Sequence, residues 1–68
     1  MNIDNIFNHH PPTDEQIPCY QAIRGAAKGF ALTILSNTPR GVDQDAALQK
    51  LRECVMFANS AIALDGKL

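Results

Sequence analysis

Two cations on one face of a predicted helix are the side chains best suited to ligand chemistry in this sequence. Arg24 and Lys28 stand four residues apart in the stretch IRGAAKG, and residues 16–42 contain no acid. Like charges at this spacing repel each other by about 0.2–0.5 kcal/mol. A guanidinium binds phosphate through paired hydrogen bonds, and an ammonium adds a point charge. We interpret the pair as an anion site; the alternative is a solvated helix face.

Imidazole and aromatic side chains near this pair could contact the rest of a ligand. His9 and His10 precede two prolines, and either imidazole could stack on a ligand or hydrogen-bond to it. The alternatives are a plain polar arm or a metal site, but no CxxC or HxxxH motif completes a set of four zinc ligands. Tyr20 lies on an apolar stripe, so it could pack in a core or offer a π-face to a base from a neighbouring chain. We predict that no metal is bound.

The usual catalytic motifs are absent from the sequence. No serine elbow, paired carboxylates, phosphate-binding glycine loop or dinucleotide fingerprint occurs. Cys19 and Cys54 lack a nearby histidine, and we interpret them as small buried apolar thiols. We predict no disulfide between them, because a turn near residue 40 would place Cys19 opposite roughly residue 60. The sequence predicts a protein that is not an enzyme and needs no cofactor.

The length and the net charge limit the classes of protein to which the chain could belong. A chain of 68 residues forms one domain and buries only about 60% of its unfolded surface, so self-association is expected to stabilise it. The net charge of −1 argues against a protein that coats DNA. No apolar run approaches the ~20 residues of a membrane span. The polar start MNIDNIFNHHPP lacks a signal-peptide core, which indicates a cytoplasmic protein.

The elements that would position these side chains are two long helices. Residues 1–12 are predicted to be an irregular arm, because Pro11 and Pro12 favour extended backbone. A helix then begins at Thr13, where TDEQ forms a capping box with Gln16, and Pro18 predicts a kink or restart. The helix ends at the turn SNTPRG. Its apolar stripe comprises Ile17, Tyr20, Ile23, Ala27, Phe30, Ala31 and Ile34.

A second helix follows from about Asp43 and ends near Gly66, which would serve as its C-cap. Its segment CVMFANSAIAL is apolar nearly all round, and such a helix is normally buried on several sides. We therefore predict an all-α fold, in which residues 13–68 form one antiparallel two-helix hairpin that assembles into a homo-oligomeric bundle. The stripe of this second helix comprises Ala47, Leu51, Val55, Ala58 and Ile62.

Three motifs carry a resemblance to a known family over residues 7–66. They are an aromatic, histidine and proline stretch at residues 7–12, the IRGAAK helix at 23–28, and MFANSAIA at 56–63. Together they resemble the small hairpin-domain proteins of bacteriophages that act as anti-CBASS and anti-Thoeris sponges. The resemblance implies a phage protein in the cytoplasm of the infected bacterium. It would sequester cyclic di- or trinucleotide messengers without cleaving them and so block CBASS effectors.

The resemblance also implies an assembly and a site. Such proteins form homohexamers whose ligand pockets lie between protomers, where an arm tyrosine and a basic helix residue contact the ligand. By motif position the basic residue is Arg24, and His9, fifteen residues earlier, stands where the family usually shows tyrosine. Lys28, His10, Tyr20 and Phe7 complete the predicted ligand-binding set. One alternative is an oligomeric protein-interaction module without a nucleotide ligand. A weaker one is a nucleic-acid binder.

Overall fold

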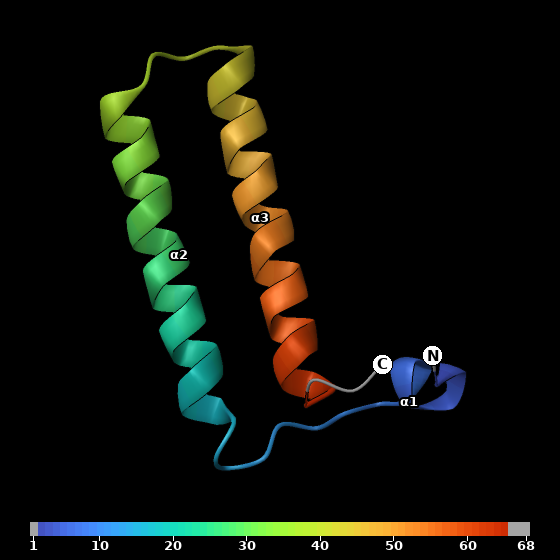
Figure 1. Cartoon of the computed structure of the whole chain (residues 1–68). Coiled ribbons are helices and arrows are strands. Elements are labelled where there is room, and N and C mark those ends of the chain that lie inside the picture. The colour runs from blue at the N-terminus through green and yellow to red at the C-terminus, as the bar shows by residue number, and fades with distance from the viewer. Residues whose placement is uncertain (1, 66–68) are drawn as a thin grey trace.

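The computed structural model describes residues 2–65, which form three α-helices. α1 spans Ile3–Phe7, α2 spans Ile17–Asn37 and α3 spans Val42–Ala63. The two long helices run antiparallel side by side, and α1 lies beyond the base of this hairpin (Figure 1). No strand occurs within the described residues, so the prediction of an all-α hairpin is confirmed. None of these helices is both long and apolar enough to cross a lipid bilayer.

The predicted capping box closes the turn that leads into α2. The Thr13 hydroxyl oxygen accepts a hydrogen bond from the Gln16 amide at 3.2 Å, and Gln16 Oε1 accepts one from the Thr13 amide at 3.1 Å. Regular helix begins only at Ile17, later than the predicted Thr13. Pro18 then falls in the first turn of α2, where its missing N–H would have had no helical partner. The helix therefore begins one residue before Pro18, in place of the predicted kink or restart of a helix that had begun at Thr13.

A buried glutamine closes the other end of the hairpin. Gln44 Nε2 donates to the carbonyl oxygen and to the hydroxyl oxygen of Thr38, each at 3.1 Å. Asp43 and Asp45 lie in the first turn of α3, where carboxylates favour the positive end of the helix dipole. Gln44 thus connects the start of α3 to the residue that ends α2.

The far end of α3 differs from the prediction in detail. The helix ends at Ala63, and Asp65 adopts a left-handed backbone with φ of 52°. An aspartate tolerates this region better than most residues. The predicted cap at Gly66 lies outside the described residues.

The helices meet along one narrow seam of half-buried residues spaced by three and four, which is the pattern of a coiled coil. The predicted stripes are correct except at their edges. Ile17 and Phe30 are exposed, and Leu48 replaces Ala47 as a half-buried position, because a single partner helix covers less of the circumference than the predicted stripes span. The seam comprises Tyr20, Ile23, Ala27, Ala31 and Ile34 of α2 with Leu48, Leu51, Val55, Ala58 and Ile62 of α3.

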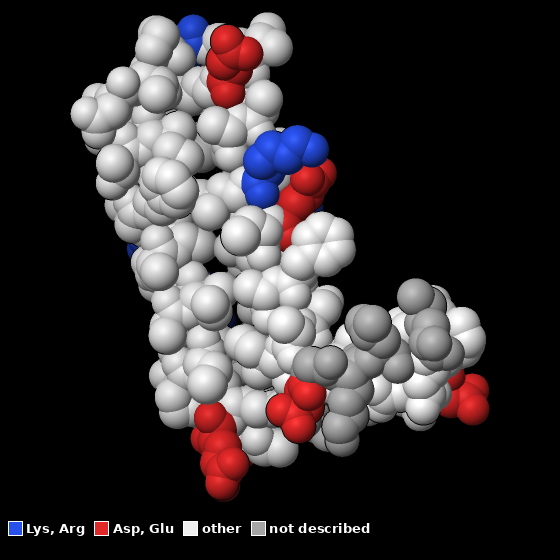
Figure 2. Space-filling model, viewed as in Figure 1, with Lys and Arg blue, Asp and Glu red and all other residues white. Residues whose placement is uncertain are grey.

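A single chain has no enclosed core. Within residues 2–65 no apolar side chain is buried, and Gln44 is the one buried residue. Val42 and Phe57 are 84% and 76% exposed, and the face in Figure 2 is mostly white along α2. Cys19 and Cys54 are free, as predicted, but they are exposed rather than buried. A lone hairpin therefore leaves much apolar surface in water, which supports the predicted assembly.

The arm is not irregular throughout, contrary to the prediction. Residues Ile3–Phe7 form a short helix whose N-cap, Asn2, accepts a hydrogen bond from the Asn5 amide through its side-chain oxygen at 3.0 Å. Among the described helices only α2 and α3 pack against each other. The two prolines predicted an extended arm, but the Asn2 cap favours a short helix before them.

We expect Gln44→Ala to lower the free energy of unfolding by about 1–2 kcal/mol, because both hydrogen bonds to Thr38 are lost. Urea unfolding at fixed protomer concentration measures the effect. Gln49→Ala is the matched control, since Gln49 is exposed on the same helix and should change stability by less than about 0.5 kcal/mol. Equal losses in the two variants would contradict a closing role for Gln44.

Candidate ligand-binding site

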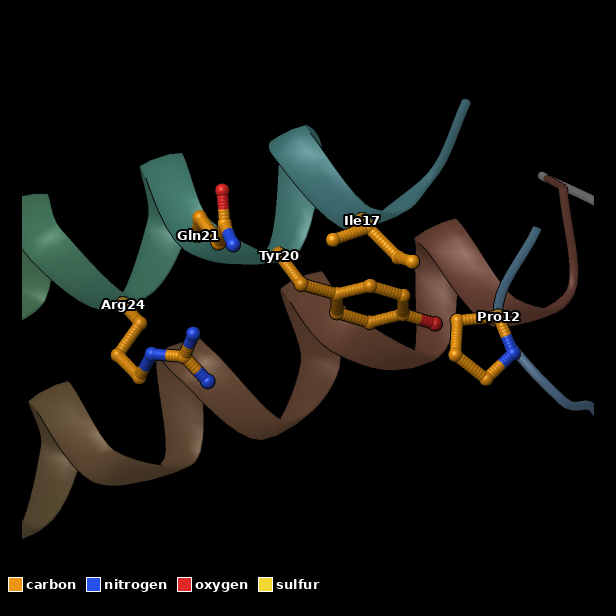
Figure 3. Close-up of a pocket in the computed structure, with 5 residues that line it drawn as sticks. All are labelled: Pro12, Ile17, Tyr20, Gln21 and Arg24. Carbon is orange, nitrogen blue, oxygen red and sulfur yellow. The ribbon is translucent and has the colours of Figure 1, made fainter. Parts of the chain in front are cut away.

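A hollow of about 350 Å³ opens on the flank of the hairpin near the start of α2. Figure 3 shows the Tyr20 ring lying between the side chain of Ile17 and the ring of Pro12, and the Arg24 side chain projecting from the same side of α2 as Tyr20. The hollow therefore combines an aromatic face, apolar edges and a guanidinium. Its lining residues are Pro12, Ile17, Tyr20, Gln21 and Arg24.

Local sequence places these groups together. Tyr20 and Arg24 are four residues apart on α2, so their side chains lie one above the other on the same face. Gln16 Nε2 donates to the carbonyl oxygen of Ile62 at 2.9 Å, which connects the start of α2 to the end of α3. Since Gln16 is also bonded to Thr13, the arm leaves the hairpin at a defined point. Pro12 is thereby held beside Tyr20.

The guanidinium in this hollow has no acidic partner. Among residues 2–65 the one ion pair joins Lys50 Nζ to Glu53 Oε2 at 3.2 Å. Arg24 is exposed and has no carboxylate within 4.0 Å in that part of the chain. Tyr20 is half-buried, so its ring is positioned by packing. This combination of an unpaired cation and a fixed ring suits a ligand that carries both an anion and a flat apolar group.

Lys28 does not share the hollow of Arg24, although both residues lie on one face of α2 as predicted. Lys28 instead lines a second hollow, of about 440 Å³, together with Arg52 and Met56 of α3. Four residues correspond to about 6 Å along a helix, which is enough to place the two cations over separate depressions. Within one chain the predicted pair is therefore two separate cationic positions.

The predicted ligand-binding residues of the arm, Phe7, His9 and His10, lie outside both hollows. His9 is exposed, and Phe7 is exposed at the end of α1. His10 Nε2 is hydrogen-bonded to the Asn5 carbonyl oxygen, which holds the segment after α1 close to that helix. Of the predicted ligand-binding residues, a single chain brings together only Tyr20 and Arg24. Within residues 2–65 no group of three His, Cys, Asp or Glu side chains is arranged to hold a metal ion.

Sequence reasoning missed several lining residues. Pro12 and Gln21 carried no signal of a site, because their place depends on where the arm leaves the hairpin. Arg52 could have been found, since a turn near residue 40 places it opposite Lys28.

The third hollow, of about 190 Å³, is apolar, and its lining includes Phe30 and Cys54.

These observations place the protein in the class of small helical hairpins. On its flank an exposed cation, Arg24, lies beside a half-buried aromatic ring, Tyr20. Residues 1–63 match the family model described as Acb2/Tad1, hairpin domain, and the chain belongs to this family of anti-CBASS and anti-Thoeris sponge proteins. The resemblance predicted from residues 7–66 is thus confirmed. No curated protein matches the chain, and no solved structure matches it either.

Tyr20 offers a direct test of the site, because the chain contains one tyrosine and no tryptophan. A unit charge attracts an anion at 4 Å by about 1 kcal/mol in water, so Arg24 should concentrate iodide around the ring. We expect Arg24→Gln to reduce iodide quenching of tyrosine fluorescence by up to a few-fold and to leave quenching by neutral acrylamide unchanged. Arg40→Gln, in the turn between the long helices, is the control. Equal iodide effects of both variants would contradict the proximity of Arg24 to Tyr20.

Proposed function

We propose that this protein binds cyclic oligonucleotide immune messengers and sequesters them without cleavage. It would act in the cytoplasm of a bacterium infected by the phage that encodes it, and would keep the messenger from CBASS effectors. The observation that carries the proposal is the hollow in which Tyr20 and Arg24 lie together, in a chain of the sponge family.

The chemistry of the hollow supports this ligand class. A phosphate can accept two hydrogen bonds from the Arg24 guanidinium, and a base can stack on the Tyr20 ring. Pro12 and Ile17 add apolar edges that would cover the base. Binding of this kind needs no nucleophile and no general base, so we propose that the protein is not an enzyme.

The complete site requires more than one chain. A two-fold interface presents each residue twice, which matches a cyclic dinucleotide with its two phosphates. We propose that neighbouring chains bring His9 and His10 of the arm to the ligand, and that Lys28 contributes to the positive potential. The number of chains we propose, six, rests on the family resemblance. Cyclic trinucleotides remain candidates alongside dinucleotides.

A second candidate function is a protein-interaction module with no nucleotide ligand. The observation that favours it is the amount of exposed apolar surface on α3, where Met56 and Phe57 are 59% and 76% exposed. A surface of this kind marks a site of association with another protein or with copies of the same chain.

Ligand-dependent stabilisation separates these functions. A ligand that binds only the folded protein, at 100 times its Kd, stabilises it by about 2.7 kcal/mol, which corresponds to a melting temperature rise of several degrees. We expect one member of a panel of cyclic di- and trinucleotides to cause such a rise, with Arg24→Ala abolishing it. The ligand should be recovered intact by mass spectrometry after heat release.

Arg40→Ala is the matched control, because Arg40 is exposed and lines none of the three hollows. It should retain the shift. A folded protein that gives no shift with any member of the panel would support the interaction module instead. Binding of ordinary single strands with a steep salt dependence would indicate a nucleic-acid binder.

The proposed assembly gives a separate prediction. Phe30 is 57% exposed beside the apolar hollow that contains Cys54, and a charge there would have to be desolvated in an interface. We expect Phe30→Glu to lower the mass of the assembly measured by sedimentation, from about six chains toward one or two. Gln49→Glu adds the same charge at an exposed polar position and should leave the mass unchanged. A wild-type monomer would contradict the assembly.

A further inference from the structure

The hollow beside Lys28 is lined by two cations and by apolar side chains. Lys28 comes from α2 and Arg52 from α3, and neither has a carboxylate within 4.0 Å among residues 2–65. The volume of about 440 Å³ can hold apolar side chains as well as a charge. The remaining lining residues are Ala27, Ala31, Leu48, Leu51, Val55 and Met56.

Helix α1 has the complementary character and packs against no other helix among residues 2–65. Phe7 lies four residues after Ile3 and three after Asp4, so its side chain neighbours both of theirs on the helix surface. All three are exposed, Ile3 by 60% and Phe7 by 80%. α1 packs on neither long helix, and isolated helices shorter than about 12 residues are marginal in water. A five-residue helix with exposed apolar side chains is therefore expected to be stabilised by packing against another surface.

We propose that α1 of one chain docks into the Lys28–Arg52 hollow of a second chain. Asp4 would lie between Lys28 and Arg52. Ile3 and Phe7 would cover the apolar residues that line the hollow. Charge complementarity selects this occupant, because Asp4, an acid, is the one charged residue of α1, whereas the hollow is lined by two bases and no acid.

The geometry favours a second chain over the same chain. The arm leaves the base of its own hairpin and carries α1 away from α2 (Figure 1). The hollow lies eleven residues into α2, from Ile17 to Lys28, which is about 16 Å along the helix from that base. An exchanged arm would connect protomers and carry His9 onto the neighbour. The inference itself concerns an assembly contact and does not require a nucleotide ligand.

Disulfide crosslinking tests the contact in the full chain. Asp4→Cys is combined with Arg52→Cys in a background of Cys19→Ser and Cys54→Ser, which removes two exposed thiols. A disulfide requires Cα atoms within about 7 Å, so docking predicts covalent dimers and longer ladders on a non-reducing gel. The control pairs Asp4→Cys with Lys50→Cys, an exposed position turned roughly to the opposite side of α3.

We expect the pair at positions 4 and 52 to crosslink between chains at least tenfold faster than the control pair. Equal rates would overturn the proposal, and so would a crosslinked product with the mass of one chain, which would show that each arm covers its own hairpin.

A charge exchange gives a second readout if the cysteine variants do not fold. Asp4→Lys should lower the mass of the assembly, because it places a third cation in the hollow. Adding Arg52→Glu should restore it. A mass that is unchanged by Asp4→Lys, or a loss that Arg52→Glu fails to recover, would count against the contact. Neither outcome depends on whether a cyclic nucleotide binds at Tyr20 and Arg24, so the two proposals fail separately.

Discussion

Two paired helices can bury only the stripes that face each other, and this limit governs the rest of the structure. Small and branched side chains along the seam are half-buried, yet no apolar side chain among residues 2–65 is fully buried. Burial of apolar surface is the main favourable contribution to folding, and each ordered residue costs about 1.5 kcal/mol in entropy. Phe57 and Val42 therefore stay exposed in a single chain, which favours the assembly proposed above.

Polar side chains fix the two ends of the hairpin, where apolar packing is weakest. Gln44 joins α3 to Thr38 at one end, and Gln16 joins α2 to Ile62 at the other. Gln16 also takes part in the capping box with Thr13, so a single amide determines both the helix start and the exit of the arm. The hollow at Tyr20 lies directly above this junction. The site is therefore placed by the most constrained part of the arm.

The sequence predicts the hairpin well because its signals are local. The capping box at Thr13 and the three-and-four spacing of the seam each depend on residues within one or two turns. The separation of Lys28 from Arg24 was not predicted, because it depends on how α3 packs across α2. Helix α1 was missed, since two prolines outweighed the asparagine cap. Phe7 and His9 are exposed in a single chain, and their predicted contact with a ligand came from the family resemblance and not from a local pattern.

The affinity that a sponge needs links the hollow to the assembly. Nanomolar binding requires about 12 kcal/mol. Two charge-assisted hydrogen bonds from Arg24 would supply about 3–6 kcal/mol, and one stacked base about 1–3 kcal/mol, so the Arg24 and Tyr20 of a single chain fall short by about a quarter or more. A two-fold interface doubles both contributions and encloses the ligand, which removes water from around the charges. The exposed apolar faces of the hairpin and the small number of ligand contacts in one hollow thus favour the same proposal, in which association of chains would complete both the core and the site.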